Sequence, residues 1–320
     1  MVVTEEVYAA MLRLAHIVIA MTLAWGAAGA VAQELPAAAN GRVASFSGTA
    51  LSRIAASAAV RRGVRTAESV RASARALVQS GVLKTQLRGR AYDWDAGPHA
   101  SLPRVVLRRV LAAGQSSPSE ADYLAELRAS QNAVDAKGIL SRADGLVAQL
   151  SSAGLLPGSE SFVAVHQGGG ALGLEDAATG RRELLVTERR VVYRRHAGGI
   201  PIVGRSGEFE IVFDVQGDAL EIELPSDEYS ASSSAGASSG RSTLRTLDGS
   251  AALAQAMRAA GFDRVPTAAN AVVAKGGTSF EVRDLQCGFM ESESGTTLQR
   301  GCVVVYASKK AAVQELLPVD

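Results

Sequence analysis

The sequence has few of the residue types and motifs that mark a catalytic centre. It contains two cysteines and four histidines in 320 residues. It lacks H-E-x-x-H, the zinc-peptidase motif. G-x-S-x-G, the pattern of the nucleophile elbow of α/β-hydrolases, occurs only at 236–240, within the predicted Ser-rich linker. Two isolated thiols without a nearby histidine supply too few ligands for a structural metal site. We therefore expect no catalytic residues, no metal and no cofactor, and a protein that is not an enzyme.

The N-terminus has the three parts of a secretory signal peptide. Arg13 precedes a short apolar run, small residues follow it, and Ala30-Val31-Ala32 has the A-x-A form of a cleavage site. Because acidic residues are unusual in front of such a run, we expect translation to start at Met11. The run is short for a membrane span, and an uncleaved anchor is the alternative. The sequence predicts a secreted or periplasmic protein that is cleaved near Ala32.

Two cysteines, Cys287 and Cys302, lie beyond the predicted leader. An even number of cysteines in an exported chain favours a disulfide. The bond would close a loop of sixteen residues, counting both ends, and stabilise the fold by about 3 kcal/mol in the loop-entropy model. The runs Phe280–Met290 and Cys302–Ala307 are typical of strands. The cysteines would therefore lie near the mouth of a hairpin, where a cross-strand bridge is geometrically suitable.

Charge is unevenly distributed, although the net charge is only +1. Residues 41–115 hold twelve arginines and one lysine against three acidic residues, so the remainder of the chain is acidic. Apolar residues at helical spacing, such as Val70, Ala74 and Leu77, predict one or two helices in this segment. Such a charge excess can mark an arm for anionic lipid or nucleic acid, or simply a solvated helix. We favour the solvated helix and expect no nucleic-acid partner.

The middle of the chain predicts a helix followed by a β-meander. Helical apolar spacing over Ser141–Ser152 stops at Gly154. Over Glu188–Glu223, residues of strand-forming type and alternating polarity predict three consecutive strands. Gly198-Gly199-Ile200-Pro201 interrupts the first two of them. The predicted fold class is therefore α+β, with a helix packed on an antiparallel meander.

Two further patterns are considered as sites. Gly168–Gly173 matches G-x-G-x-x-G after a strand, but the residues after it do not form the apolar helix that a dinucleotide site needs, so we predict a flexible hairpin loop. Asp93 and Asp95 flank Trp94, a combination found in sugar-binding and glycosidic sites. Because a glycosidase draws its two acids from separate elements, the sequence gives this pair little support.

The stretch 191–204, VVYRRHAGGIPIVG, resembles the propeptide module of thermolysin- and fungalysin-type metallopeptidases and the related PepSY domains. The shared features are a strand ending in a tyrosine and a basic residue, a Gly-Ile-Pro-Val-like turn, and a strand that leads to an acidic-then-glycine turn, here Asp214–Gly217. The resemblance covers about residues 120–224. It implies a cystatin-like fold, a helix on an antiparallel sheet. In that family the module assists folding of the protease that follows it and inhibits it until removed.

No peptidase domain follows here, because only 96 residues come after Leu224. The resemblance therefore implies a non-catalytic protein-binding or peptidase-inhibitor-like module. Its partner would be a secreted peptidase or another extracytoplasmic protein. The alternatives are an envelope-associated structural protein and an enzyme with no recognisable site motif.

The weak binding site that this resemblance implies lies around the turn. Its residues are Tyr193, Arg194, Arg195, His196, Gly199, Ile200, Pro201 and Gly204. The basic triplet at 194–196 would form either an anion site or an exposed strand end. Proline lacks an N–H and suits a bend or a sheet edge, so the turn is either a corner needed only for folding or an edge that contacts a partner.

The sequence thus predicts five segments. They are a signal peptide (1–32), a basic Ala/Arg-rich helical segment (33–115), a propeptide-like α+β domain (116–226), a Ser-rich linker (227–243), and a small α+β module with a helix, a β-hairpin and the disulfide (244–320).

Overall fold

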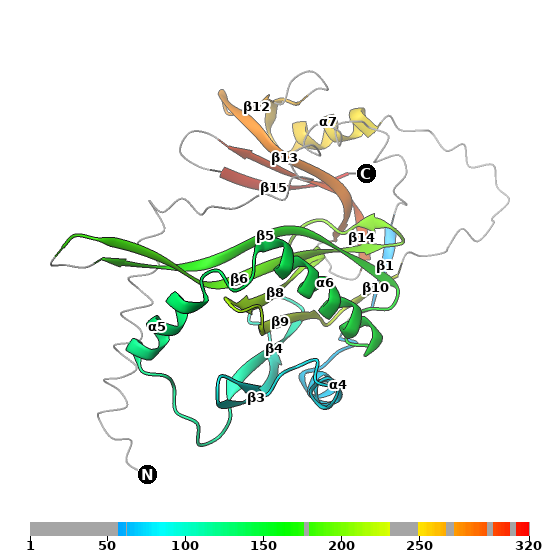
Figure 1. Cartoon of the computed structure of the whole chain (residues 1–320). Coiled ribbons are helices and arrows are strands. Elements are labelled where there is room, and N and C mark those ends of the chain that lie inside the picture. The colour runs from blue at the N-terminus through cyan, green and yellow to red at the C-terminus, as the bar shows by residue number, and fades with distance from the viewer. Residues whose placement is uncertain are drawn as a thin grey trace, which may run out of the picture. The chain divides into compact units, whose positions relative to one another are not determined.

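The computed structural model has a mixed α+β fold with two antiparallel sheets (Figure 1). It describes residues 57–61, 63–175, 179–230, 249–266, 272–292, 297–307 and 312–319. All of these belong to one compact unit, Glu34–Asp320. The predicted signal peptide and most of the predicted Ser-rich linker lie outside the described residues.

The larger sheet has eight strands in the order β2-β3-β4-β9-β8-β6-β5, and the short β7 pairs with the end of β6. Its strands are β2 (Gln86–Leu87), β3 (Arg90–Pro98), β4 (Arg104–Leu111), β5 (Glu160–Glu175), β6 (Arg182–Ala197), β7 (Ile200–Pro201), β8 (Glu208–Asp214) and β9 (Ala219–Pro225). The alternating sequence over 188–223 correctly predicted the central strands, because one face of that meander is buried.

Helices α4 (Ala67–Gln79) and α6 (Ala136–Ser152) share one hydrophobic core with this sheet. Helix α4 starts at a capping box: Thr66 accepts the N–H of Ser69, and the Ser69 side chain accepts the N–H of Thr66. Figure 1 shows α6 lying over β5 and β6. The prediction of a helix on an antiparallel sheet is confirmed at this level.

The segment predicted to be helical, 33–115, is helical only in part. Its described residues form α4 and the strands β1 (Ser57–Arg61), β2, β3 and β4. Strand β4 pairs with β9, so the segment is built into the same sheet as residues 116–226. Val105 and Leu107 of β4 are buried in the core with α4. The charged residues of this segment suggested a solvated helix, and its strands were missed. In β4, apolar residues lie on both faces, so polar and apolar residues do not alternate clearly.

The stretch Gly168–Gly173 is a strand and not the flexible loop predicted from its glycines. It lies inside β5 and pairs with β6. A Cβ at Gly169 would lie 2.3 Å from the carbonyl oxygen of Glu188, so this position has room only for glycine. The element that follows is a strand, β6, and not the helix of a dinucleotide site. Here the glycines serve close approach of two strands.

The second sheet has seven strands in the order β10-β1-β14-β13-β12-β11, with β15 also paired to β14. Beside β1, its strands are β10 (Glu228–Ser230), β11 (Phe262–Arg264), β12 (Val272–Lys275), β13 (Thr278–Glu291), β14 (Thr297–Ala307) and β15 (Ala312–Pro318). Helix α7 (Gly249–Ala259) buries Leu253 and Met257 in the core of this sheet. The predicted order of a helix and then strands is therefore present in this part of the chain.

The predicted disulfide is present. Cys287 and Cys302 lie directly opposite each other on β13 and β14, and they are bonded. Their Cα atoms are 4.0 Å apart. The bond locks the register of the long β13–β14 hairpin, on which most of the second sheet is built.

A buried ion pair lies where the two sheets meet. The guanidinium of Arg195 on β6 donates to both carboxylate oxygens of Glu160 on β5, at 2.7 and 2.8 Å. It also donates to the carbonyl oxygen of Asp227 at 2.7 Å and lies 4.2 Å from the centre of the Tyr229 ring on β10. Glu160 in turn accepts the N–H of Tyr229. The two side chains are 2% and 0% exposed, so β10 joins the larger sheet through a fully desolvated charge pair.

Substitution Glu160→Gln should destabilise the protein by about 3–5 kcal/mol, because it leaves the charge of Arg195 buried without its counter-ion. The free energy of unfolding in urea measures this effect. The matched control is Glu175→Gln, whose partner Arg182 is exposed; it should cost under about 1 kcal/mol. A cost for Glu160→Gln as small as that of the control would contradict a stabilising role for the buried pair.

Candidate functional site

The predicted site residues on β6 are mostly buried. Tyr193 is 1% exposed, stacks on Phe209 and donates its hydroxyl to Asp144 of α6 at 2.8 Å. Burial and this hydrogen bond raise the pKa of Tyr193 far above its usual value. Tyr193 therefore fastens α6 to the sheet. Tyr193 lies inside β6, which continues to Ala197, and its side chain faces the core.

The basic triplet 194–196 is not an exposed strand end. Arg195 is the buried partner of Glu160, and Arg194 is bound to Glu208 of β8 and Gln286 of β13. His196 is half-buried, and burial lowers its pKa despite a contact with the carbonyl oxygen of Arg194. Both arginine side chains are thus engaged by the protein's own groups.

The Gly-Ile-Pro turn is covered by the second sheet. Val203 donates its N–H to the carbonyl oxygen of Phe289 on β13 at 2.7 Å, and Ile202 bridges the same residue. A Cβ at Gly288 would lie 2.0 Å from the carbonyl oxygen of Pro201. Ile200 packs against the core of the second sheet. The surface that the sequence offered as a partner-contacting edge is therefore occupied by β13 of the same chain.

Two glycines shape this turn in different ways. Gly199 has φ +80° with open space where a Cβ would stand, and Gly204 has φ +88° with Leu316 of β15 3.3 Å away. Positive φ favours glycine at both positions. Only the Gly199 end of the predicted binding site remains open beside the turn.

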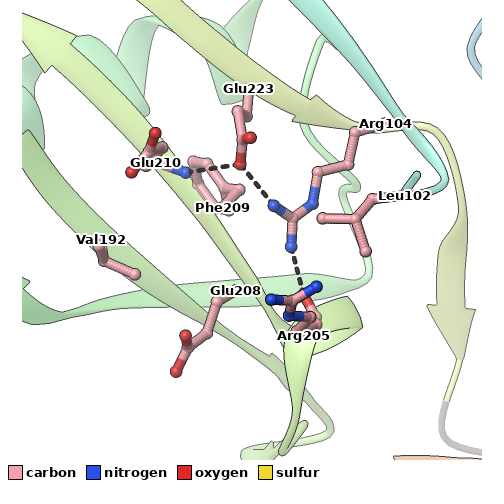
Figure 2. Close-up of a pocket in the computed structure, with 8 residues that line it drawn as sticks. All are labelled: Leu102, Arg104, Val192, Arg205, Glu208, Phe209, Glu210 and Glu223. Atoms are coloured by element: carbon pink, nitrogen blue, oxygen red, sulfur yellow. Dashed lines mark hydrogen bonds and ion pairs between the residues drawn. The ribbon is translucent and has the colours of Figure 1, made fainter. Parts of the chain in front are cut away.

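A shallow pocket of about 280 Å³ lies on the sheet face opposite α4 and α6 (Figure 2). It is lined by Leu102, Arg104, Val192, Arg205, Glu208, Phe209, Glu210 and Glu223. Arg104 donates to Glu223 at 2.5 Å and to the carbonyl oxygen of Arg205, as Figure 2 shows. The nearest ring nitrogen of His99 lies 3.4 Å from the other oxygen of Glu223. The pocket joins four strands with charges that neutralise one another.

Glu210 in this pocket has a pKa that is raised above its ordinary value. Burial raises its pKa most, and the neighbouring carboxylates of Glu223, Glu221 and Glu188 raise it further, against the effect of Arg190. Arg190 lies 3.0 Å from Glu210 and 2.5 Å from Glu188. The arrangement holds a proton more readily than an ordinary glutamate, but the same carboxylates already have protein partners.

The basic residues of the N-terminal segment find acidic partners in the later part of the chain. Arg88 and Arg109 both contact Asp214, at 3.2 and 3.3 Å. The other pairs of this kind are Lys84 with Asp218, Arg88 with Glu126, Arg104 with Glu223 and Arg108 with Glu221. Much of the charge excess that suggested an arm for an anionic partner is thus neutralised within the sheet.

The aspartate pair of β3 does not line the pocket of Figure 2. Asp93 and Asp95 are exposed, and Asp95 is paired with Arg71 of α4 at 2.9 Å. The indole N–H of Trp94 donates to the carbonyl oxygen of Lys84. Within the described residues, no three histidine, cysteine or acidic side chains come together as a metal site. In the same residues, no helix is long and apolar enough to cross a membrane.

The two outer edges of the β5–β6 hairpin differ. Where β6 runs beyond β8, the amide of Gln131 caps it: Gln131 accepts the N–H of Val186 at 2.8 Å and donates to its carbonyl oxygen at 3.0 Å. Strand β5 is the last strand on its side of the sheet as far as the chain is described. Strand β10 contacts β5 only at its start, where the side chain of Glu160 accepts the N–H of Tyr229. A strand was predicted only up to Gln167, because the glycines that follow favour a loop, so the length of this edge was not predicted.

The edge of β5 lacks the residues that usually protect a sheet edge. Natural edges carry lysine, proline or other charges that discourage strand addition. Between Ser161 and Leu174, β5 has no proline, lysine, arginine, aspartate or glutamate. Val163 on this strand is 51% exposed. A long strand with open backbone and no blocking charge is suited to pairing with another extended segment.

Comparison with known proteins identifies no family. No family model matches the chain, and no curated protein matches it. A search of solved structures finds the crystal structure of an uncharacterized protein from Eubacterium rectale ATCC 33656, with 9% sequence identity and a TM-score of 0.35 over 83% of this chain and 82% of that one. A likeness at this level supports no argument about fold or function.

The raised pKa of Glu210 predicts the pH dependence of one variant. The folded state binds this proton more tightly than the unfolded state. The contribution of Glu210 to the free energy of unfolding of the wild type therefore falls as pH rises from the ordinary glutamate pKa through the raised one. Glu210→Gln removes that loss, so its stability relative to wild type should increase over the same pH window. Urea unfolding at several pH values measures this.

The control is Glu183→Gln. A hydrogen bond from Arg128 lowers the pKa of Glu183, so this variant should lose stability relative to wild type as pH rises through the lowered pKa and up to the ordinary one. Parallel pH profiles for the two variants would contradict the assignment for Glu210.

Proposed function

We propose that this protein is an exported, non-catalytic binding module that pairs with an extended segment of another extracytoplasmic protein along strand β5. The observation that carries the proposal is the open, uncharged edge of β5. Its backbone groups point away from the sheet with no described strand beyond them, while the neighbouring edge of β6 is capped by Gln131. An extended segment added there would gain main-chain hydrogen bonds without rearranging the sheet.

Two further observations support the exported, inhibitor-like part of the proposal. The disulfide between Cys287 and Cys302 is of the kind that persists in oxidising compartments. The resemblance of residues 191–204 to the propeptides of thermolysin- and fungalysin-type peptidases makes a secreted peptidase the partner to test first. Because β13 covers the Gly-Ile-Pro turn, we place partner contact at β5 and not at that turn.

Substitution Val163→Lys should abolish or strongly weaken partner binding, since a lysine on an open edge opposes strand addition. Binding is measured by biolayer interferometry against a panel of purified secreted metallopeptidases of the thermolysin and fungalysin types, together with inhibition of their activity. We expect at least one to bind and to lose about tenfold or more in affinity with the variant, a change of about 1.4 kcal/mol.

Leu184→Lys is the matched control. Leu184 of β6 is 65% exposed, and its replacement by lysine makes the same change in polarity and charge. This variant should bind like wild type. Equal binding of Val163→Lys and wild type would rule out the β5 edge as the contact, and absence of binding across the whole panel would remove the peptidase partner.

A further inference from the structure

The face of β5 that lies under α6 offers more than open backbone. Leu140 and Val147 of α6 follow each other at seven-residue spacing and are only partly buried. They lie on the flank of α6 opposite Arg142, which reaches the β8–β9 turn through the carbonyl oxygens of Gln216 and Gly217. This flank is therefore turned toward β5.

On the sheet below this flank, Phe162 and Ala164 of β5 are also partly buried and packed against the same core. Gln167, two residues beyond Val165, ties β5 to α6 by donating to the carbonyl oxygen of Ala136. Because strands lie about 4.8 Å apart, side chains of an added strand on this face would contact the apolar strip of Phe162, Leu140 and Val147.

A cation lies further along the same face. Arg189 of β6 pairs with Phe213 of the core on one side and with Gly169 of β5 on the other. Its Nε atom is buried without a hydrogen-bond partner among the described residues, and the nearby carboxylates of Glu188 and Glu210 are paired with Arg190 instead. Gly169, the residue of β5 directly opposite Arg189, has no side chain that could lie between Arg189 and the open edge. An arginine side chain is long enough to cross one strand spacing.

Arg189 thus brings positive charge to this part of the sheet that the described residues leave without an ion pair, although Arg190, Arg194 and Arg195 of the same strand are paired. This charge is complementary to an acidic side chain on an added strand.

We infer that the segment bound by β5 carries apolar residues at alternate positions and, on the same face, an acidic residue that pairs with Arg189. This inference rests on the proposed function and specifies its partner: an extended acidic-apolar peptide segment. The apolar residues lie against Leu140, Val147 and Phe162, and the carboxylate lies over Gly169.

Fluorescein-labelled peptides test this directly. The probes are the nonapeptide SVSVSVSES and its reverse, SESVSVSVS, so that both strand directions are sampled, each with matched versions that carry Gln or Lys in place of Glu. Fluorescence anisotropy with the full chain should show the Glu form of one direction binding about tenfold more tightly than its Gln form, and the Lys form more weakly still.

Arg189→Gln should remove the preference for Glu over Gln and leave the affinity for the Gln peptide unchanged. The control Arg182→Gln alters an exposed arginine of the same strand that is already paired with Glu175, and it should keep the preference. Thermal unfolding followed by circular dichroism establishes that both variants are folded.

The outcomes separate the two proposals. Equal affinity of Glu and Gln peptides for wild type, or a preference that survives in Arg189→Gln, overturns the acidic partner and leaves the β5 edge in place. Peptide binding that Val163→Lys does not weaken, or no binding of any probe, contradicts pairing at β5 itself and both proposals with it.

Discussion

The desolvated pair of Arg195 and Glu160 is the interaction on which the rest of the structure depends. Neither charge is exposed, so the pair is tolerable only because its remaining hydrogen-bonding groups are also used. Arg195 reaches the carbonyl oxygens of Ser206 and Asp227, and Glu160 holds the backbone of Tyr229. One guanidinium therefore fixes the end of β6, the turn after it and the strand that enters the second sheet.

This constraint explains why the Gly-Ile-Pro turn is covered except at its Gly199 end. The turn begins at Gly198, three residues after Arg195, and β13 covers it through Phe289. The sequence interpretation placed the partner contact at this turn. Here β13 of the same chain covers the turn, and the unpaired backbone lies at the edge strand β5 instead.

The uneven charge of the sequence has a structural meaning that no local pattern could reveal. Arg104 and Arg108 of β4 face Glu223 and Glu221 of β9, on strands more than a hundred residues apart in the chain. Composition shows that one segment is basic and the rest acidic, but only the register of β4 against β9 shows that the two cancel. From one sequence, a basic segment that binds an external anionic partner cannot be told from a basic strand that pairs with an acidic strand of the same sheet.

What sequence could predict here followed from periodicity and chemistry that act locally. Alternation gave β8 and β9, the spacing of apolar residues gave α6, and the even cysteine count gave the bond between Cys287 and Cys302. The strand over Gly168–Gly173 was missed because glycine disfavours strands unless a neighbouring backbone requires it, as Glu188 does at Gly169. The open edge of β5 could not be predicted from the sequence, because whether a strand lies at an edge depends on the order of the strands in the sheet.

Strand β1 has a consequence for the order in which the protein can be built. It lies between β10 and β14, with Arg61 opposite Glu228 and Ala59 opposite Thr297. The earliest described strand thus closes a sheet whose other members come from the last third of the chain. As the polypeptide emerges from a ribosome or a translocation channel, the second sheet stays incomplete until nearly all of it has appeared, and non-local closure of this kind slows folding.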